Sequence, residues 1–240
     1  MTPARRRALP AIIAALLIAA ALALFLAMRA GQSSTAERRQ KPTLLLLTSL
    51  PLVFSEEFSL SAAGSPALDA LAKQYKVTPI SATSPADLSK GRLLLMAHPL
   101  AQTAENLVAL DEWVRGGGRV LLLADPRLEW PSKRPLGDPL RPPAMFMDTG
   151  LLGHWGLQLN GPAQLGPVHG QLAGYEVITV SPGRLSGSCA IGAGALVAEC
   201  RIGKGRVTVI ADADVLDVGE LDKAGHNLDA ILSELSKLER

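Results

Sequence analysis

The sequence lacks the features that mark a nucleic-acid-binding protein. It has only 3 Trp, 2 Tyr and 4 Phe among 240 residues, and its 24 basic side chains are nearly balanced by 22 acidic ones. Residues 1–30 hold four of the basic residues and none of the acidic ones, so the remainder is mildly acidic, with 20 basic against 22 acidic side chains. With no basic patch and so few aromatic residues, an electrostatic footprint for nucleic acid is excluded.

The motifs of several enzyme classes are also missing. The nearest approach to the G-x-S-x-G elbow of serine hydrolases, residues 183–187, has the wrong spacing. The turn Gly203-Lys204-Gly205 lacks the spacing of a phosphate-binding P-loop and is typical of a hairpin. No group of ligand-type residues has the tight spacing of a known metal motif, so the sequence predicts neither a metal nor another cofactor.

A long apolar segment occupies residues 8–28, with three arginines before it and Arg29 after it. At roughly 1.5 Å per residue it is long enough to cross a bilayer, and it exceeds the apolar core of about 7–15 residues in a cleaved secretory signal. We therefore expect a transmembrane helix at 8–28, after a cytoplasmic tail at 1–7 and before a stalk at 29–41. A cleaved signal and a buried core helix are the alternatives.

Positive charge beside the apolar segment bears on where the rest of the chain lies. The short arginine-containing tail is easily retained in the cytoplasm, although basic residues also follow the segment. We expect a single-pass protein of the inner (cytoplasmic) membrane, with the domain at 42–240 periplasmic or otherwise extracytoplasmic.

Strand and helix patterns alternate from Pro42 onward. Continuous apolar runs at Thr43–Thr48, Arg92–Met96 and Arg119–Leu123 are typical of strands buried on both faces, and Lys76–Ile80 is a weaker strand. Helices are expected after three N-cap residues, namely Ser65, Ser84 and Thr103. Repeated units of this length predict an α/β domain with a three-layer, mostly parallel sheet and right-handed crossovers.

The second half of the chain is less regular. Five prolines in the segment from Arg127 to Pro143 predict a long excursion, either a lid or a partner-binding loop. We further expect a helix at Met145–Leu157, a strand at Gly174–Val180, an antiparallel hairpin of Leu196–Ile202 with Arg206–Ala211, and a final amphipathic helix from Asn227.

The two cysteines, Cys189 and Cys200, fall in a second predicted hairpin. A two-residue turn at Gly194 and Ala195 places them directly opposite each other on one face, which is compatible with a disulfide. The pair falls on a hydrogen-bonded rung, where Cα atoms are about 5.5 Å apart and which we regard as less favourable for a bridge. Two buried thiols are the alternative.

Two stretches carry a family resemblance. Leu110–Pro126 (LDEWVRGGGRVLLLADP) and Gly203–Leu232 (GKGRVTVIADADVLDVGELDKAGHNLDAIL) resemble the amidotransferase-like α/β domain of accessory proteins of uncharacterised ABC-type transport systems, including the gliding-motility-associated group. The resemblance implies a flavodoxin/amidotransferase-like fold, and ABC permease and ATPase subunits as partners. Its recurrent residues here are Gly117, Gly118, Gly203, Gly205, Asp212, Asp214 and Asn227. Structural roles explain them equally well, because glycine ends a helix with positive φ and asparagine caps one.

Four polar residues, His98, Asp125, Asp212 and Asp214, follow apolar strands. Because parallel strands point their carboxyl ends at one edge of a sheet, these side chains are expected to share a rim that could bind a ligand or partner. The competing interpretation is that each caps a turn by bonding local backbone amides. Neither cysteine follows a parallel strand, so the nucleophile of a catalytic amidotransferase is absent.

The sequence thus predicts a membrane-anchored, non-catalytic accessory or binding subunit of a membrane complex, in which ABC-type transport is the process that the resemblance implies. A hydrolase using the rim residues is one alternative, and an extracytoplasmic sensor of a small ligand is another.

Overall fold

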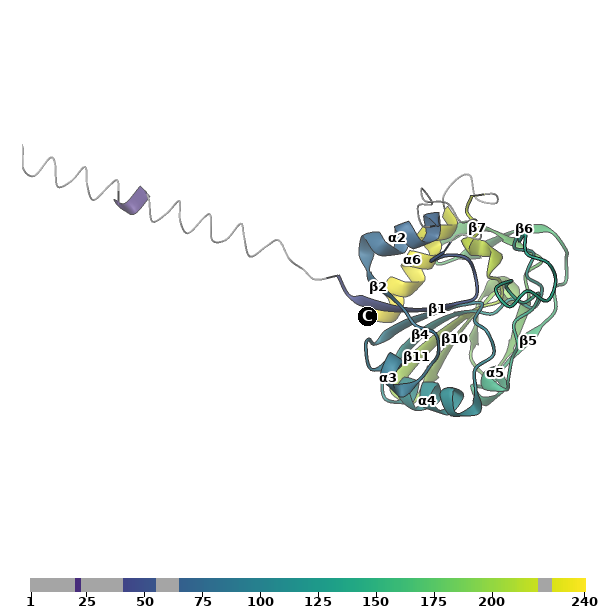
Figure 1. Cartoon of the computed structure of the whole chain (residues 1–240), viewed down its shortest axis with the longest axis horizontal. Coiled ribbons are helices and arrows are strands. Elements are labelled where there is room, and N and C mark those ends of the chain that lie inside the picture. The colour runs from purple at the N-terminus through teal and green to yellow at the C-terminus, as the bar shows by residue number, and fades with distance from the viewer. Residues whose placement is uncertain (1–19, 23–40, 55–64, 220–225) are drawn as a thin grey trace, which may run out of the picture. The chain divides into compact units, whose positions relative to one another are not determined.

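The computed structural model describes residues 20–22, 41–54, 65–219 and 226–240. The chain forms two compact units, residues 1–41 and residues 42–240. Of the first unit, Lys41 and the helical residues Ala20–Leu22 are described. The second unit contains the sheets and helices that follow (Figure 1).

No helix in the described part of the chain is long and apolar enough to cross a membrane. This finding corrects the prediction of a transmembrane helix, and with it the predicted single-pass protein of the inner membrane with a periplasmic domain. Apart from Ala20–Leu22, the predicted span at 8–28 lies outside the described residues, as do the predicted tail at 1–7 and all of the predicted stalk except Lys41.

The main sheet has seven strands in the order β2-β1-β3-β4-β11-β10-β9. The neighbours from β2 to β11 are parallel, whereas β10 is antiparallel to both β11 and β9. The strands are β1 (Thr43–Thr48), β2 (Lys76–Pro79), β3 (Leu93–Ala97), β4 (Arg119–Leu123), β9 (Ala190–Ile191), β10 (Val197–Ile202) and β11 (Gly205–Ile210). The parallel register of β4 with β11, in which Leu123 lies opposite Ile210, brings their carboxyl ends to the same edge.

Apolar residues on both faces of this sheet form its core, as the continuous apolar runs predicted. In β1, Leu44 and Leu46 belong to one apolar cluster and Leu45 and Leu47 to the other. The first cluster lies under α2 (Pro66–Gln74) and α6 (His226–Glu239), and the second under α3 (Pro85–Leu88) and α4 (Ala104–Arg115) (Figure 1). All four leucines are at most 4% exposed, and each buried leucine contributes roughly 1.5–3 kcal/mol.

Local capping explains where three of the helices begin. The side chains of Ser65, Ser84 and Thr103 accept hydrogen bonds from the backbone N–H groups three residues onward, as the sequence predicted. Proline follows Ser65 and Ser84 at the first helical position, where its missing N–H costs no hydrogen bond.

Two small antiparallel sheets complete the unit. One pairs β5 (Leu157–Asn160) with β8 (Arg184–Gly187), and the other pairs β6 (Pro167–Leu172) with β7 (Tyr175–Val180). The sequence predicted β7 but not β5, β6 or β8, because these short strands have exposed residues on one face and no continuous apolar run.

The predicted fold class is therefore wrong and is corrected here. A mixed seven-stranded sheet with two accessory hairpin-like sheets replaces the three-layer, mostly parallel flavodoxin/amidotransferase-like sheet preceded by a transmembrane helix. The two small sheets, and the finding that no described helix could cross a membrane, account for the difference, whereas the antiparallel pairing of β10 with β11 and β9 was predicted. The orientation of the small sheets depends on tertiary packing that the apolar periodicity does not encode.

The predicted helix at Met145–Leu157 is also much shorter in the structure. Only α5 (Leu151–His154) is helical, because Gly150 immediately before it has φ 95°, a left-handed conformation that ends any helix on its N-terminal side. Short 3₁₀ turns, η1 (Ala193–Ala195) and η2 (Asp214–Leu216), lie near the C-terminal strands.

Candidate functional site

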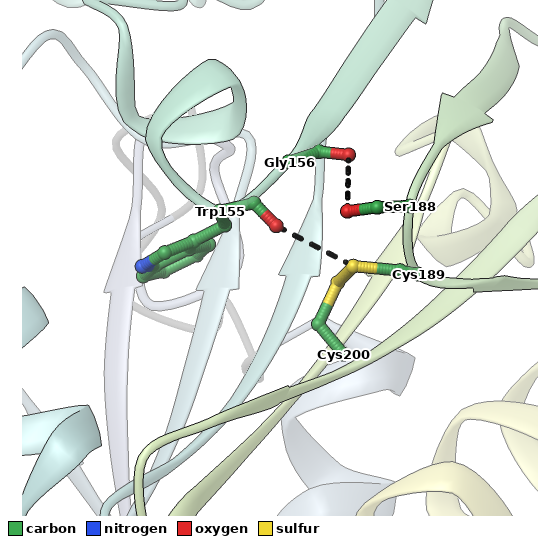
Figure 2. Close-up of a disulfide and its surroundings, with 5 residues drawn as sticks. All are labelled: Trp155, Gly156, Ser188, Cys189 and Cys200. Atoms are coloured by element: carbon green, nitrogen blue, oxygen red, sulfur yellow. Dashed lines mark hydrogen bonds between the residues drawn. A yellow bond between two sulfur atoms is a disulfide. The ribbon is translucent and has the colours of Figure 1, made fainter.

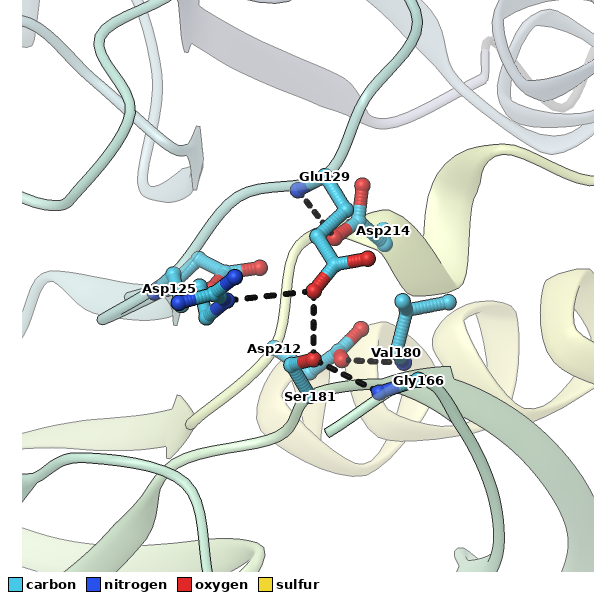
Figure 3. A network of polar contacts seen from close by, with 8 residues as sticks. Asp125, Glu129, Gly166, Val180, Ser181, Asp212 and Asp214 are labelled. Carbon is cyan, nitrogen blue, oxygen red and sulfur yellow. Dashed lines mark hydrogen bonds and ion pairs between the residues drawn. The ribbon is translucent and has the colours of Figure 1, made fainter. Parts of the chain in front are cut away.

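Three carboxylates meet at the carboxyl edge of the main sheet. Asp125 follows β4, whereas Asp212 and Asp214 follow the adjacent parallel strand β11. One oxygen from each lies within 4.8 Å of the others, and all three side chains are buried. We call these residues the acidic cluster (Figure 3). The structure thus brings together three of the four residues that the sequence placed at a shared rim.

Backbone amides surround the acidic cluster. Asp125 accepts hydrogen bonds from the N–H groups of Arg127, at 2.8 Å, and Ala213, at 2.9 Å. Asp214 accepts from the N–H of Glu129 at 2.9 Å. These bonds join the loop after β4 to the segment after β11, two parts of the chain separated by more than eighty residues.

Asp212 ties a third segment to the same point. One of its oxygens accepts from the N–H of Val180 at the end of β7, at 2.8 Å, and the other from the N–H of Val215 in η2, at 2.7 Å. Both oxygens of this fully buried side chain therefore have backbone donors. The competing interpretation from sequence, that each acid bonds local backbone amides, accounts for the bonds from Arg127 and Val215 only. The other three donors are 32 to 88 residues away in sequence.

Burial changes the acid–base behaviour of the acidic cluster. It raises the pKa of Asp125 to about 6 and that of Asp214 to about 7, in both cases against backbone hydrogen bonds that favour the ionised form. Burial, together with repulsion from Asp125 and Asp214, also raises the pKa of Asp212 well above its ordinary value. The acidic cluster therefore retains protons near neutral pH.

The three oxygens are close enough to approach one cation, but the donor set fits a hard metal ion poorly. Calcium takes six to eight oxygen ligands, and magnesium six including several waters. Here three carboxylates already accept backbone N–H groups, and they are 0%, 0% and 1% exposed for Asp125, Asp212 and Asp214. The geometry fits a structural connection between three segments.

Two further residues at this edge, Glu129 and Ser181, were not predicted from sequence. Ser181, buried at the end of β7, donates to the Glu129 carboxylate at 2.6 Å and accepts from the N–H of Gly166 at 2.9 Å. Arg127 also donates to the Glu129 carboxylate, at 3.2 Å. No sequence signal links Glu129 to Ser181, because one lies in the proline-rich segment and the other after an accessory strand.

His98 follows β3 at the same carboxyl edge, as the sequence predicted, whereas Asn227 lies within α6 and not before it. The buried ring of His98 bonds the carbonyl of Pro143 at 2.9 Å, and burial lowers its pKa. Within the described residues, the side chains that converge at this edge are Asp125, Asp212 and Asp214, and His98 is not among them. Asn227 lies inside the first turn of α6, and its side chain accepts from the N–H of Ile178 and donates to its carbonyl.

Cys189 and Cys200 form a disulfide (Figure 2). The pairing of β9 with β10 sets Ala190 opposite Glu199, which places the two cysteines opposite each other, with Cα atoms 4.9 Å apart. The connection is the 3₁₀ turn η1 in place of the predicted two-residue turn. Cys189 also contacts the carbonyl of Trp155 at 3.5 Å. Both thiols of the chain are therefore bridged.

Removing the bridge with the double change Cys189→Ala and Cys200→Ala is expected to lower the free energy of unfolding by up to about 3 kcal/mol, since the bridge restricts a loop of eleven residues in the unfolded chain. Urea unfolding measures the effect. Reductant is expected to destabilise the wild-type chain similarly and to leave the double variant unchanged. Equal stability of oxidised and reduced wild-type chains would contradict this account.

The first glycine motif, Gly117 and Gly118, shapes the end of α4. Gly117 has φ 115°, which a side chain would strain. A Cβ at Gly118 would lie 2.2 Å from the ring of Trp113. The tryptophan thus folds back over the turn that links α4 to β4.

The second glycine motif, Gly203 and Gly205, packs against the end of α4. A Cβ at Gly203 would lie 2.9 Å from the Cα of Arg115, and a Cβ at Gly205 would lie 2.1 Å from the carbonyl oxygen of Val114. The N–H of Lys204 bonds the carbonyl of Arg115 at 3.0 Å. The β10–β11 hairpin therefore meets the end of α4 backbone to backbone, which gives both glycine motifs a structural reason.

No family model and no curated protein matches the chain. Similar solved structures include the N-terminal domain of mmIFT52, which is 13% identical with a TM-score of 0.52 over 81% of this chain and 97% of that one. A beta-galactosidase from Bacillus circulans sp. alkalophilus is 11% identical with a TM-score of 0.50, over 85% of this chain and 32% of the enzyme. Exo-beta-1,4-mannosidase Op5Man5 from Opitutaceae bacterium strain TAV5 is 15% identical with a TM-score of 0.44, over 91% of this chain and 37% of the enzyme.

At these identities the likenesses show the fold alone, and the chain spans little more than a third of that mannosidase. They give no support to naming the chain an amidotransferase-like accessory protein of an ABC transporter. The prediction of an amidotransferase-like ABC accessory protein with a transmembrane helix is therefore corrected. The resemblance of the two sequence stretches stays a prediction.

Proposed function

We propose that this chain is a non-catalytic binding subunit of a protein complex, and that it contacts its partner through the β4–α5 loop (residues 124–150). The supporting observation is the exposure of four large apolar side chains on that loop: Leu136 is 86% exposed, Leu140 68%, Met145 54% and Met147 53%. Apolar side chains gathered on one segment are typical of protein interaction sites, and methionine adapts readily to a partner surface.

The β4–α5 loop is held in place at its base. The N–H of Leu128 bonds the carbonyl of Ala144 at 3.0 Å, and the N–H of Phe146 bonds the carbonyl of Asp125 at 2.6 Å. Leu128 and Trp130 line a pocket of about 280 Å³ within the loop. An ordered base lowers the entropy that binding would cost, and the pocket offers room for an apolar side chain of a partner.

The hydrolase alternative rests on the acidic cluster, whose raised pKa values resemble those of general acids. Its carboxylates are at most 1% exposed, so a substrate would reach them only after η2 or the β4–α5 loop moved. The disulfide also occupies both thiols. These observations favour a structural role for the acidic cluster and a binding role for the chain.

Photo-crosslinking tests the proposal. A photoreactive residue at Leu136 or Leu140 is expected to give a discrete crosslinked product with a second protein in the source cells, whereas one at Val108, which is 58% exposed on α4, is expected to give none. Changing Leu136→Asp together with Leu140→Asp is expected to weaken the complex at least tenfold, since each leucine buried on binding contributes roughly 1.5–3 kcal/mol. The same products from all three positions would contradict the proposal.

A further inference from the structure

The outer edge of β7 is closed by side chains. Asn227 accepts from the N–H of Ile178 at 2.9 Å and donates to its carbonyl at 2.8 Å, so the amide group acts as a neighbouring strand would. Asp212 accepts from the N–H of Val180 at 2.8 Å. The backbone groups at Ile178 and Val180 therefore point away from β6.

This orientation determines which residues of β6 direct their backbone groups to its free edge. In an antiparallel pair, a residue whose N–H and C=O point outward lies opposite a residue whose groups also point outward. His169 lies opposite Ile178, and Gln171 lies opposite Glu176, two residues earlier on β7. His169 and Gln171 therefore direct their backbone N–H and C=O groups to the outer edge of β6. Within the described residues, no hydrogen bond reaches these groups.

A cavity of about 380 Å³ adjoins this edge. Its lining includes the β6 residues Val168–Gln171, together with Arg184, Gly194 and Leu196. Gly170 adds no side chain to the space. Val168 and Leu196 make part of the wall apolar, so the cavity can receive an apolar side chain next to a strand paired with β6.

Arg184 supplies the charge at this cavity. Its side chain is exposed, and within the described part of the chain it has no acidic partner. His169, by contrast, pairs with Glu176 at 3.0 Å on the outer face of the hairpin. An unpaired guanidinium beside an apolar space favours a ligand that carries a carboxylate.

We propose that the free edge of β6 binds an extended acidic peptide of a partner protein by strand addition. The peptide pairs its backbone with His169 and Gln171, places an apolar side chain in the cavity and directs a carboxylate to Arg184. Main-chain hydrogen bonds provide affinity in this mode, while the cavity and the arginine provide specificity. This edge is separate from the β4–α5 loop, so the two proposals can fail independently.

Panning a phage-displayed library of random short peptides on the full chain tests the proposal. We expect the selected peptides to combine an acidic residue with alternating apolar residues, and their binding to slow hydrogen exchange at the amides of His169 and Gln171. Selection of no peptide above background, or of peptides that leave these amides unprotected, would overturn the proposal.

Two variants locate the binding on this edge. Gln171→Pro removes an outward N–H without touching the β6–β7 ladder, and proline is tolerated on edge strands. It is expected to weaken the selected peptides about tenfold, whereas Gln171→Thr, which keeps the N–H, is expected to bind them as the wild type does. Arg184→Gln is expected to weaken binding and reduce its salt dependence. Peptides bound equally well by Gln171→Pro and Arg184→Gln chains of wild-type melting temperature would refute the assignment.

Discussion

Replacing Asp214 with Asn is expected to stabilise the chain at pH 7.5 and to flatten its dependence on pH. In the folded chain the pKa of Asp214 is about 7, whereas an aspartate in an unfolded chain titrates near about 4. As pH rises between these values, the unfolded chain ionises first. The stability attached to the protonated side chain is therefore complete below about pH 4 and is lost as pH passes 7.

The difference between a pKa of about 7 in the folded chain and one of about 4 in the unfolded chain corresponds to roughly 4 kcal/mol. Asn keeps an oxygen for the N–H of Glu129 and removes the charge. Asp125, whose pKa is about 6, contributes in the same direction, whereas His98, whose pKa burial lowers, destabilises the folded chain on acidification. The difference between wild type and variant isolates the effect of Asp214.

Thermal unfolding at pH 7.5 and pH 5 measures that difference. We expect the Asp214→Asn chain to melt several degrees above wild type at the higher pH and by about a third of that margin at the lower one. Glu112→Gln, which changes an exposed carboxyl on α4, serves as the control and is expected to follow wild type at both. A variant that is less stable than wild type at pH 7.5 would show that the ionised side chain stabilises the fold.

Replacing Gly205 with Ala is expected to lower the free energy of unfolding by more than about 3 kcal/mol or to prevent folding. The added Cβ would lie 2.1 Å from the carbonyl oxygen of Val114 and 2.4 Å from that of Gly118. Both are backbone atoms at the α4–β4 turn, so neither can move without displacing the end of the helix. A drop of this size lowers the melting temperature by roughly 10 °C.

Gly161→Ala is the matched control, because no atom lies within 4 Å of its added Cβ. We expect its melting temperature to stay within about 2 °C of wild type. Soluble expression shows whether each variant folds, and thermal unfolding followed by circular dichroism measures its melting temperature. A Gly205→Ala chain as stable as the control would mean that the β10–β11 hairpin and α4 separate easily, and that the glycine motifs have another cause.

The sequence predicted the strands that are buried on both faces, because their apolar runs are continuous. β1, β3 and β4 all lie where those runs are. The half-exposed strands β5, β6 and β8 were missed, since a short strand on an accessory sheet has no such pattern. These small sheets, together with the finding that no described helix could cross a membrane, are the reason the predicted fold class was wrong.

The acidic cluster was predictable in part because strand ends meet at one edge of a parallel sheet. Asp125 and Asp212 follow neighbouring parallel strands, and this places them together. The role of Asn227 was not predictable in the same way. Its local position suggested a helix cap, but its partner, Ile178, is forty-nine residues away in sequence.

The edges of the main sheet affect how readily two copies of the chain aggregate. A sheet edge is a template for pairing with other chains, so folded proteins commonly keep their edges short or obstructed. At one edge, β2 has four residues and ends in Pro79, and at the other β9 has two residues, joined to β10 through Cys189 and Cys200. The disulfide holds the short strand β9 beside β10, and we therefore expect it to hinder edge-to-edge aggregation. This effect is separate from its effect on unfolding.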